Sequence, residues 1–268
     1  MSIQHYTCFC ILLFLAACTL AEAPSRDAPP MSEEMKNISN RSNLAGWEGD
    51  PRLWSVRDGF IHGETTLEVP IKSNSFLIWR DGIAKDFELR LSFRCSPGGN
   101  SGILFRAKRT TDLAKKNLWS VRGYQFKVRN ENVLPDTAGF LYDEGGNRGR
   151  MCMVGEVASM ERSGKKLVAE TMLNAVDFKK LMKTGTWNEA IIVAKGNNIK
   201  HYLNDRLVVD FTDNSPELSS KEGVLALQLS TGKPMWVEFK DLRLLEITDE
   251  DPKKERDASS EPNVENPN

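Results

Sequence analysis

The sequence predicts a predominantly β domain, a sandwich or jelly roll of two antiparallel sheets. Three observations predict it: short segments alternate apolar and polar residues, Gly- and Asn-containing turns separate them, and only residues 177–183 suggest a helix. A parallel sheet would instead need long, usually helical, connections between its strands. The 268 residues are enough for one large β domain.

Period-two alternation marks strands in the first half of the domain, at residues 87–93, 101–106 and 124–128. In the first of these strands, the side chains on one face are Phe87, Leu89, Leu91 and Phe93. Apolar faces of this kind pack against each other between the two sheets of a sandwich. The opposite face of each strand then carries its polar residues.

The second half of the domain begins with two successive hairpins, whose turns are expected at residues 196–198 and 204–205. Residues 225–229 form another one-sided strand with leucine at alternate positions. In the last strand, residues 237–244, the apolar positions change phase after Phe239. That change of phase predicts a β-bulge.

Composition divides the chain into a leader, a flexible tether, a globular jelly-roll domain and a disordered polar tail, at residues 1–23, 24–43, 44–247 and 248–268. Residues 8–17 form an apolar run with the length of a signal-peptide core, too short to span a bilayer as a helix. Residues 15–18 are similar to a bacterial lipobox, in which Cys18 is lipidated. The sequence therefore predicts export to the cell envelope on a lipid anchor. Cleavage after residues 21–23 and secretion is the alternative.

The charge balance excludes a strongly polyelectrolyte partner. With 36 basic and 37 acidic residues the net charge is −1, so neither nucleic acid nor an anionic membrane surface is expected to bind, and membrane contact is expected only through the anchor. Outside the leader the cysteines are Cys95 and Cys152. Export permits a disulfide between them, and two free thiols are the alternative. No pattern predicts an oligomeric state.

Polar residues suited to ligand binding gather, by strand parity, on the face that points away from the core. They are Asn100, Arg106, Gln125, Lys127, Gln228 and Ser230, with the small residues Gly102 and Ala226 among them. Planar amides and a guanidinium suit sugar hydroxyls, and small residues leave room for a ligand. The alternative is a solvated outer face, which antiparallel sheets commonly have.

Residues 139–150 place two adjacent carboxylates, Asp143 and Glu144, beside a glycine-rich turn that contains Arg148. A carboxylate near arginine stays ionised, which suits a base or a metal ligand, although a plain polar turn has the same composition. Parity puts the two carboxylates on opposite faces without deciding which one meets a ligand. No cofactor is specified; carboxylate and carbonyl oxygens could hold a divalent cation such as calcium, but no dedicated loop spacing is present.

A series of short motifs runs through the domain: Gly46-Trp47-Glu48-Gly49, Gly99-Asn100-Ser101-Gly102-Ile103 with Phe105-Arg106, Gly123-Tyr124-Gln125, Leu141-Tyr142-Asp143-Glu144 with Arg148-Gly149, His201-Tyr202-Leu203-Asn204, and Ala226-Leu227-Gln228-Leu229. Each motif is weak, but their order is specific. Over about residues 44–247 it resembles the 3-keto-disaccharide hydrolase domain family. The resemblance implies a concanavalin A-like jelly roll of two curved sheets, with an oxidised sugar or glycan bound on the concave face.

The resemblance implies cleavage of 3-keto-glycosides by hydrolysis or by elimination and hydration, because a ketone at C3 acidifies the hydrogen at C2 and lets the oxygen at C1 leave. It implies Glu144 or Asp143 as the base and Arg106 as the stabiliser of the enolate. The substrate-binding residues that it implies are Asn100, Gln125, Lys127, Gln228, Arg148, Trp47 and Glu48.

Two positions depart from the family pattern: Lys127 stands where many members carry an acid, and Ser230 stands where many carry histidine. Such changes would favour an acidic sugar, remove a metal ligand or abolish catalysis. The alternative function is a non-catalytic, lectin-like module that binds glycans at the cell surface, and a structural or adhesion sandwich is a third. The enzyme requires Glu144 or Asp143, whereas the lectin would bind unoxidised sugars.

Overall fold

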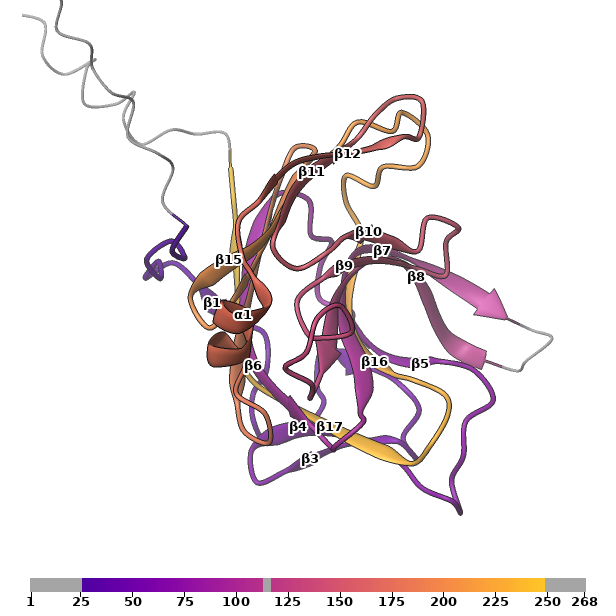
Figure 1. Ribbon diagram of the computed structural model, residues 1–268. Coiled ribbons are helices and arrows are strands. Elements are labelled where there is room, and N and C mark those ends of the chain that lie inside the picture. The colour runs from indigo at the N-terminus through magenta and orange to yellow at the C-terminus, as the bar shows by residue number, and fades with distance from the viewer. Residues whose placement is uncertain (1–25, 113–116, 249–268) are drawn as a thin grey trace, which may run out of the picture.

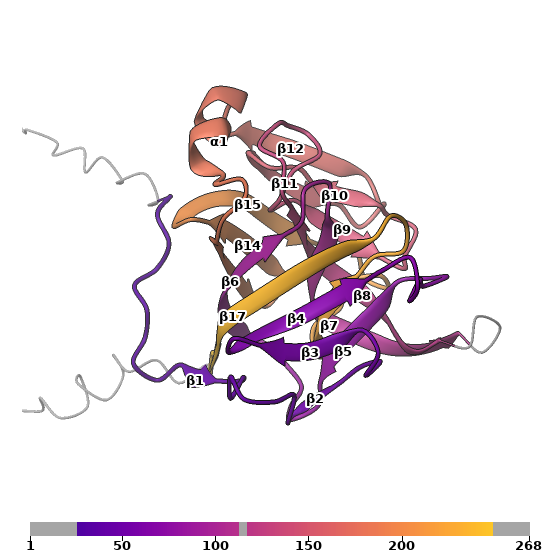
Figure 2. The ribbon, with the colours of Figure 1, turned by 90° about the horizontal axis from the view of Figure 1, so that it is seen from below.

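The computed structural model describes residues 26–112 and 117–248, which form two sheets packed face to face (Figure 1). In this part of the chain the large sheet has ten strands. In spatial order they are β12 (Lys166–Thr171), β11 (Glu156–Met160), β15 (Arg206–Asp213), β14 (Asn198–Leu203), β13 (Asn188–Lys195), β6 (Phe87–Cys95), β17 (Met235–Glu246), β4 (Phe60–Thr65) and β3 (Trp54–Arg57), with β1 (Lys36–Asn37) beside β17. Figure 2 shows β17, β4 and β3 side by side.

The small sheet carries the residues of greatest functional interest. Its seven strands within the described residues are β10 (Arg150–Cys152), β9 (Leu141–Glu144), β8 (Asn117–Arg129), β7 (Asn100–Asp112), β16 (Val224–Leu229), β5 (Ser75–Trp79) and β2 (Trp47–Glu48). Neighbouring strands in both sheets run antiparallel, apart from β11 and β15, which are parallel. The predicted jelly-roll sandwich of two antiparallel sheets is confirmed.

The core lies between the sheets and uses the alternating side chains of both. Phe87, Leu89, Leu91 and Phe93 enter it from β6, as their spacing predicts, and Phe126 on β8 meets Phe93 edge to face with ring centroids 6.1 Å apart. Burying a large apolar side chain contributes about 1.5–3 kcal/mol. These side chains therefore hold the sheets together and leave the opposite face of the small sheet free for other residues.

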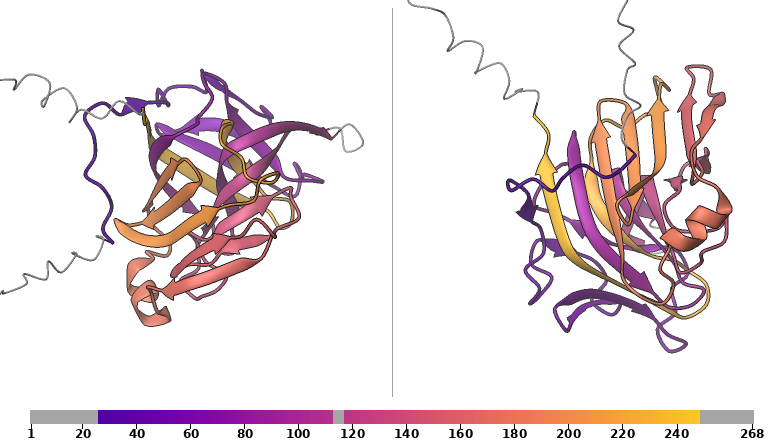
Figure 3. Two further views of the ribbon diagram at one scale, coloured as in Figure 1. Left: turned by 90° about the horizontal axis from the view of Figure 1, so that it is seen from above. Right: turned by 60° about the vertical axis from the view of Figure 1, so that its left-hand side comes forward.

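Local expectations about turns are confirmed. The chain turns at residues 196–197 and 204–205 between β13, β14 and β15. The bulge in β17 lies between Lys240 and Arg243, where Asp241 has a φ of 55°. The helix α1 (Ala175–Leu181) begins two residues before its expected start, because the Asn174 side chain accepts hydrogen bonds from the backbone of Val176 and Asp177. It lies near β11 and β12 (Figure 3).

Residues 26–43 do not behave as the predicted flexible tether. They run along the large sheet (Figure 2), where Ala28 N donates to Asp205 O and Ile38 N donates to Leu242 O. β1 pairs with the far end of β17. Open backbone groups at the rim of the sheet give this polar segment hydrogen-bond partners that its composition does not reveal.

The two cysteines of the domain are free and buried, and no disulfide joins Cys95 to Cys152. Burial raises the pKa of the Cys95 thiol to about 12. The predicted leader of residues 1–23 lies outside the described residues, as does the predicted tail apart from its first residue. Among the helices of the described chain, none is both long and apolar enough to cross a membrane.

Candidate functional site

A group of polar side chains lies on the outer face of the small sheet, away from the core. Five of the predicted residues form it, and they are called the polar floor here: Asn100, Gln125, Lys127, Gln228 and Ser230. They come from β7, β8 and β16, which are adjacent in the sheet, with Ser230 one residue beyond the end of β16. The parity of three separate strands therefore brings these side chains together, as predicted.

Gly102 is the centre of the polar floor. It lies opposite Lys127 on β8, and the pairing of Leu227 with Ile103 puts Gln228 of β16 on its other side. A Cβ atom at Gly102 would lie 2.3 Å from the side-chain amide nitrogen of Gln125. The amide of Gln125 therefore occupies the space that any other residue at 102 would fill, and it lies over β7, the strand between β8 and β16.

Hydrogen bonds within the floor leave two amide donors without acceptors. Lys127 Nζ lies 3.3 Å from Gln125 Oε1, and because an ammonium can only donate, the free end of that amide is Nε2. Ser230 Oγ donates to Gln228 Oε1 at 3.1 Å. Both Nε2 atoms are buried without a partner among the described residues. Each orphaned donor costs about 1–3 kcal/mol, so the floor is suited to an added acceptor.

Asn100 and Lys127 complete the floor. Asn100 Oδ1 is likewise buried and has no partner within the described chain. Lys127 is only 7% exposed, and its Nζ lies 5.6 Å from the ring centroid of Tyr142 on β9. Burial lowers the pKa of Lys127 to about 8, against the opposing charge of Glu144. The floor thus holds an amine that releases its proton more easily than a surface lysine.

Glu144 is the carboxylate that shares this face. It lies opposite Gly123, two register positions from Tyr142, which pairs with Gln125. Asn74 Nδ2, from the connection before β5, donates to Glu144 Oε1 at 2.7 Å. Asn117 Nδ2 in turn donates to the Asn74 carbonyl at 2.7 Å. These contacts tie the start of β5 to β8 and β9, because the small sheet curls on itself.

A cleft of about 480 Å³ opens at this point. Its walls include Asn74, Asn117 and Glu144, and Phe76 and Val121 contribute apolar surface. Phe76 pairs with Gln228 in the register of β5 and β16, so the inner end of the cleft adjoins the polar floor. The volume is in the range of small-molecule sites.

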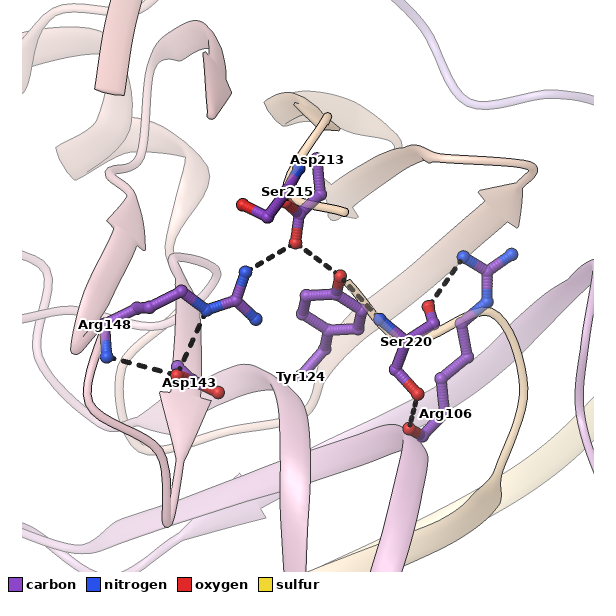
Figure 4. A network of polar contacts seen from close by, with 7 residues as sticks. All are labelled: Arg106, Tyr124, Asp143, Arg148, Asp213, Ser215 and Ser220. Carbon is purple, nitrogen blue, oxygen red and sulfur yellow. Dashed lines mark hydrogen bonds and ion pairs between the residues drawn. The ribbon is translucent and has the colours of Figure 1, made fainter. Parts of the chain in front are cut away.

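Asp143 faces the other way and belongs to a different network (Figure 4). Arg148 donates to its Oδ2 from the backbone nitrogen at 3.1 Å and from Nε at 3.2 Å. Arg148 Nη1 and the Tyr124 hydroxyl both donate to Asp213 Oδ2 at 2.6 Å. Ser220 N donates to the Tyr124 hydroxyl at 3.2 Å. This network links β9 through Asp143, β8 through Tyr124 and β15 through Asp213. Asp143 and Arg148 are therefore not part of the polar floor.

The pKa values in this network follow from burial and charge. Burial would raise the pKa of Asp213, but hydrogen bonds from Tyr124 and Arg148 outweigh it, so the pKa lies below its usual value. Burial and the charge of Asp213 raise the pKa of Tyr124. Asp213 is therefore an ionised, buried carboxylate that holds the guanidinium of Arg148 in place.

Arg106 does not lie on the polar floor, contrary to the prediction from parity. Between the pairs Phe105–Tyr124 and Lys108–Arg122, β7 has one residue more than β8, and Arg106 adopts a φ of 47°. This bulge turns its side chain away from the face that Asn100 shares. The guanidinium donates to the carbonyls of Lys85 and Gly196 and to Asp86 Oδ1, at 2.7–2.8 Å.

The two remaining predicted residues lie at the edge of the small sheet. Trp47 packs in the core, and its Nε1 donates to the Ile38 carbonyl at 2.7 Å. Glu48 lies on the outer face and accepts from Arg109 Nη2 at 3.0 Å. This hydrogen bond lowers the pKa of Glu48. Neither residue joins the polar floor.

Sequence reasoning missed Asn74, Asn117 and Asp213. Each acts through a partner at least 43 positions away, so no local pattern marks it. Tyr124 belongs to the Gly123-Tyr124-Gln125 motif, but the sequence does not reveal that its partner is Asp213. Across residues 26–112 and 117–248, no three His, Cys, Asp or Glu side chains are grouped so that they could hold a metal ion.

Jelly-roll sandwiches occur in lectins and in many unrelated proteins, so the fold alone assigns no activity. Residues 34–245 match the family described as the 3-keto-alpha-glucoside-1,2-lyase-like domain, and the chain belongs to this family. This match confirms the resemblance seen in the motifs. The family description and one related hydrolase place the chain in a carbohydrate-active, hydrolase-like family.

Known proteins resemble this chain at low sequence identity. A 3-keto-disaccharide hydrolase of Bacteroides thetaiotaomicron is 23% identical over 203 residues, which cover 71% of this chain and 63% of that protein. A candidate glycosyl hydrolase of Parabacteroides distasonis has a solved structure with a TM-score of 0.53 at 17% identity, covering 82% of this chain and 99% of that one. A carbohydrate-binding module of Bacillus subtilis has a TM-score of 0.45 at 18% identity, covering 74% and 93%.

Proposed function

We propose that the protein cleaves glycosides whose sugar carries a ketone at C3, by hydrolysis or by elimination followed by hydration, with Glu144 as the base. The observation that carries this proposal is the shared face of Glu144 and the two orphaned amide donors. A carboxylate and a pair of unsatisfied donors are what proton abstraction next to a ketone requires.

In this mechanism the ketone oxygen accepts hydrogen bonds from Gln125 Nε2 and Gln228 Nε2. Negative charge develops on that oxygen when Glu144 removes the proton at C2, and buried donors stabilise such charge strongly because water is excluded. The proton on Glu144 then passes to the glycosidic oxygen as its bond to C1 breaks. Arg106 has no part in this scheme because its guanidinium is bound to carbonyls elsewhere.

The hydrogen bond from Asn74 uses one lone pair of Glu144 Oε1 and orients the carboxylate, which has further lone pairs to accept the proton. Gln125 and Gln228 are fully buried, so the ketone reaches them only when side chains at the inner end of the cleft move. We place the rest of the glycoside in the cleft between Asn117 and Phe76.

The test is release of free sugar from a panel of 3-keto-disaccharides, with the unoxidised disaccharides as controls. We expect the wild-type protein to cleave oxidised substrates only. Glu144→Gln should lower kcat by at least about 100-fold, the usual contribution of a general base. Asp143→Asn is the matched control on the opposite face, and kcat per folded molecule should change only a few-fold.

Absence of cleavage across the whole panel would contradict the proposal. If the same preparation binds unoxidised sugars, the non-catalytic lectin-like module is the correct function. A larger loss in Asp143→Asn than in Glu144→Gln, with both variants folded, would assign the base to the other carboxylate.

We also propose that the protein is exported and lipid-anchored through Cys18, on the strength of the leader sequence alone. Expressed with its leader in a bacterial host, the protein should partition into the detergent phase of a phase-separation assay. Cys18→Ala should move it to the aqueous phase. Cytoplasmic wild-type protein with an intact leader would contradict export.

A further inference from the structure

The amine of Lys127 is the reactive group of the polar floor that the mechanism above leaves unused. We propose that Lys127 is a nucleophile whose Nζ forms an imine with the C3 ketone of a sugar that reaches the polar floor from the cleft. This inference rests on the proposed function and names a covalent intermediate for it. The substrate class is then a sugar ketone, which an amine can attack and an intact sugar lacks.

The position of Lys127 supports this role. It lies directly opposite Gly102, over which the amide of Gln125 lies. Its Nζ is 3.3 Å from Gln125 Oε1, so it lies beside the same amide whose Nε2 is free. A ketone oxygen held by Gln125 Nε2 and Gln228 Nε2 brings its carbon within reach of this amine. The same two donors stabilise the oxyanion that forms when the amine attacks.

The surroundings of Lys127 favour the neutral amine. An ammonium has three donors, yet Nζ makes one hydrogen bond and one contact with the Tyr142 ring within the described residues. Burial is the largest cause that lowers its pKa to about 8, a value in which Arg129 and Arg150 add to the effect of burial and Glu144 opposes it. At pH 7 about one Lys127 side chain in ten is then unprotonated, several hundred times the fraction for a free lysine. Such an amine can act as a nucleophile.

The chemical steps balance without an added oxidant or metal. Neutral Nζ attacks C3, and the ketone oxygen leaves as water after it takes one proton from the amine and one from solvent, which gives a protonated imine. Glu144 removes the proton at C2, and the C2–H electron pair forms the C2–C3 double bond of an enamine. The enamine expels the oxygen at C1, which takes the proton from Glu144, and C1 and C2 become doubly bonded as the imine returns.

Water then adds to the imine, releases the ketone and regenerates the amine, and the solvent proton is returned. A second water that adds at C1 completes hydrolysis. Without that second addition the product is an unsaturated keto sugar, so the same intermediate serves elimination and hydrolysis. The positive nitrogen accepts the electron pair that would otherwise rest on the enolate oxygen, which makes removal of the C2 proton easier.

Reductive trapping tests the imine directly. The protein is incubated at pH 7 with methyl 3-keto-α-glucoside, which has no free aldehyde, and with cyanoborohydride, which reduces protonated imines. We expect the peptide that contains Lys127 to gain the mass of the sugar less one oxygen atom. Methyl α-glucoside should give no adduct. The exposed Lys195 of β13, in the other sheet, serves as the internal control for nonspecific labelling.

Lys127→Arg separates a nucleophile from a simple cation, because arginine keeps the charge but forms no imine under these conditions. We expect it to lose trapping and to lower kcat at least about 100-fold on 3-keto-disaccharides, while Lys195→Arg changes neither. Because a variant at a buried position can misfold, its fold is checked by thermal unfolding. The trapping experiment uses the wild-type protein and does not depend on this variant.

The outcomes keep this inference apart from the proposed function. Cleavage by the wild-type protein with no Lys127 adduct, or with kcat retained in Lys127→Arg, overturns the imine and leaves the proposed function standing. Adduct on Lys195 and Lys127 alike also overturns it, as nonspecific labelling. A Lys127 adduct without any cleavage supports the nucleophile and contradicts the proposed cleavage.

Discussion

Asp143 and Glu144 are consecutive residues of β9, yet their carboxylates face opposite sides of the small sheet and have different partners. Asp143 accepts hydrogen bonds from Arg148, whereas Glu144 accepts one from Asn74. One position in a strand therefore separates a structural carboxylate from a candidate base. The two residues allow their roles to be tested with nearly identical substitutions.

The buried network around Asp213 is expected to be a major source of stability. Asp213→Asn would remove the negative charge that the buried guanidinium of Arg148 meets at 2.6 Å. Removing one member of a buried ion pair typically costs about 3–5 kcal/mol. Urea unfolding monitored by tryptophan fluorescence measures the change. Asp210→Asn is the matched control, because the Asp210–Lys200 ion pair is more exposed and its charged atoms are 3.5 Å apart. This substitution should lower the free energy of unfolding by less than about 1 kcal/mol.

The same network predicts part of the acid sensitivity. The folded-state pKa of Asp213 lies below its usual 3.8, so the folded protein releases this proton more readily than the unfolded chain. Its contribution is therefore fully present above the unfolded pKa and is lost as the pH falls through the folded value. Unfolding free energies from pH 7 to pH 2 should fall less steeply for Asp213→Asn than for the wild type. Parallel curves for the two proteins would contradict this.

Lys127 predicts that stability also rises with pH in a second, alkaline range. Its folded pKa of about 8 lies below the 10.5 of a free lysine, so between these values the unfolded chain binds more protons and stability rises with pH. The rise is on the order of 3 kcal/mol. Lys127→Met removes this titration, so it should be more stable than the wild type at pH 7 and lose that advantage by about pH 10.5. A difference that does not change with pH would show that Lys127 titrates normally.

Gly102→Ala should disable the polar floor without unfolding the protein. The added methyl group would lie 2.3 Å from the Gln125 amide nitrogen and would push that amide out of position. We expect a loss of turnover similar to that of Gln125→Ala, measured on 3-keto-disaccharides. In the Gln125→Ala background the methyl group meets no amide, so Gly102→Ala should cost little more. Additive losses in this double-mutant cycle would show that Gly102 acts through something other than Gln125.

Much of the fold could be predicted because it depends on short-range patterns. Alternation identifies the core face of β6, turn residues identify the hairpins of β13 to β15, and a change of phase identifies the bulge in β17. Parity also separates Asp143 from Glu144 and brings Gln125 and Gln228 to one face. These features follow from the two-residue repeat of a strand, which any stretch of sequence displays by itself.

The sequence does not predict the position of a residue where an irregular backbone or a partner far away in the chain determines it. The bulge at Arg106 has no signal, since Arg106 and Ala107 continue the alternation in the sequence, and an extra residue opposite Gly123 is visible only once β7 and β8 are paired. Residues 26–43 have the composition of a free segment but lie along the large sheet through backbone hydrogen bonds, which do not depend on side-chain type.

The sequence by itself determined the sandwich, the family and the face on which each polar residue of a regular strand lies. Only the tertiary structure decided that Glu144 meets Asn74 from a separate connection and that Asp143 is held by Arg148. It also decided that the Gln125 amide lies over Gly102, the residue beside which the register puts Gln228. The physical reason is range: alternation is a property of neighbours in the chain, whereas a site is made where strands far apart in sequence are brought side by side by burial of their apolar faces.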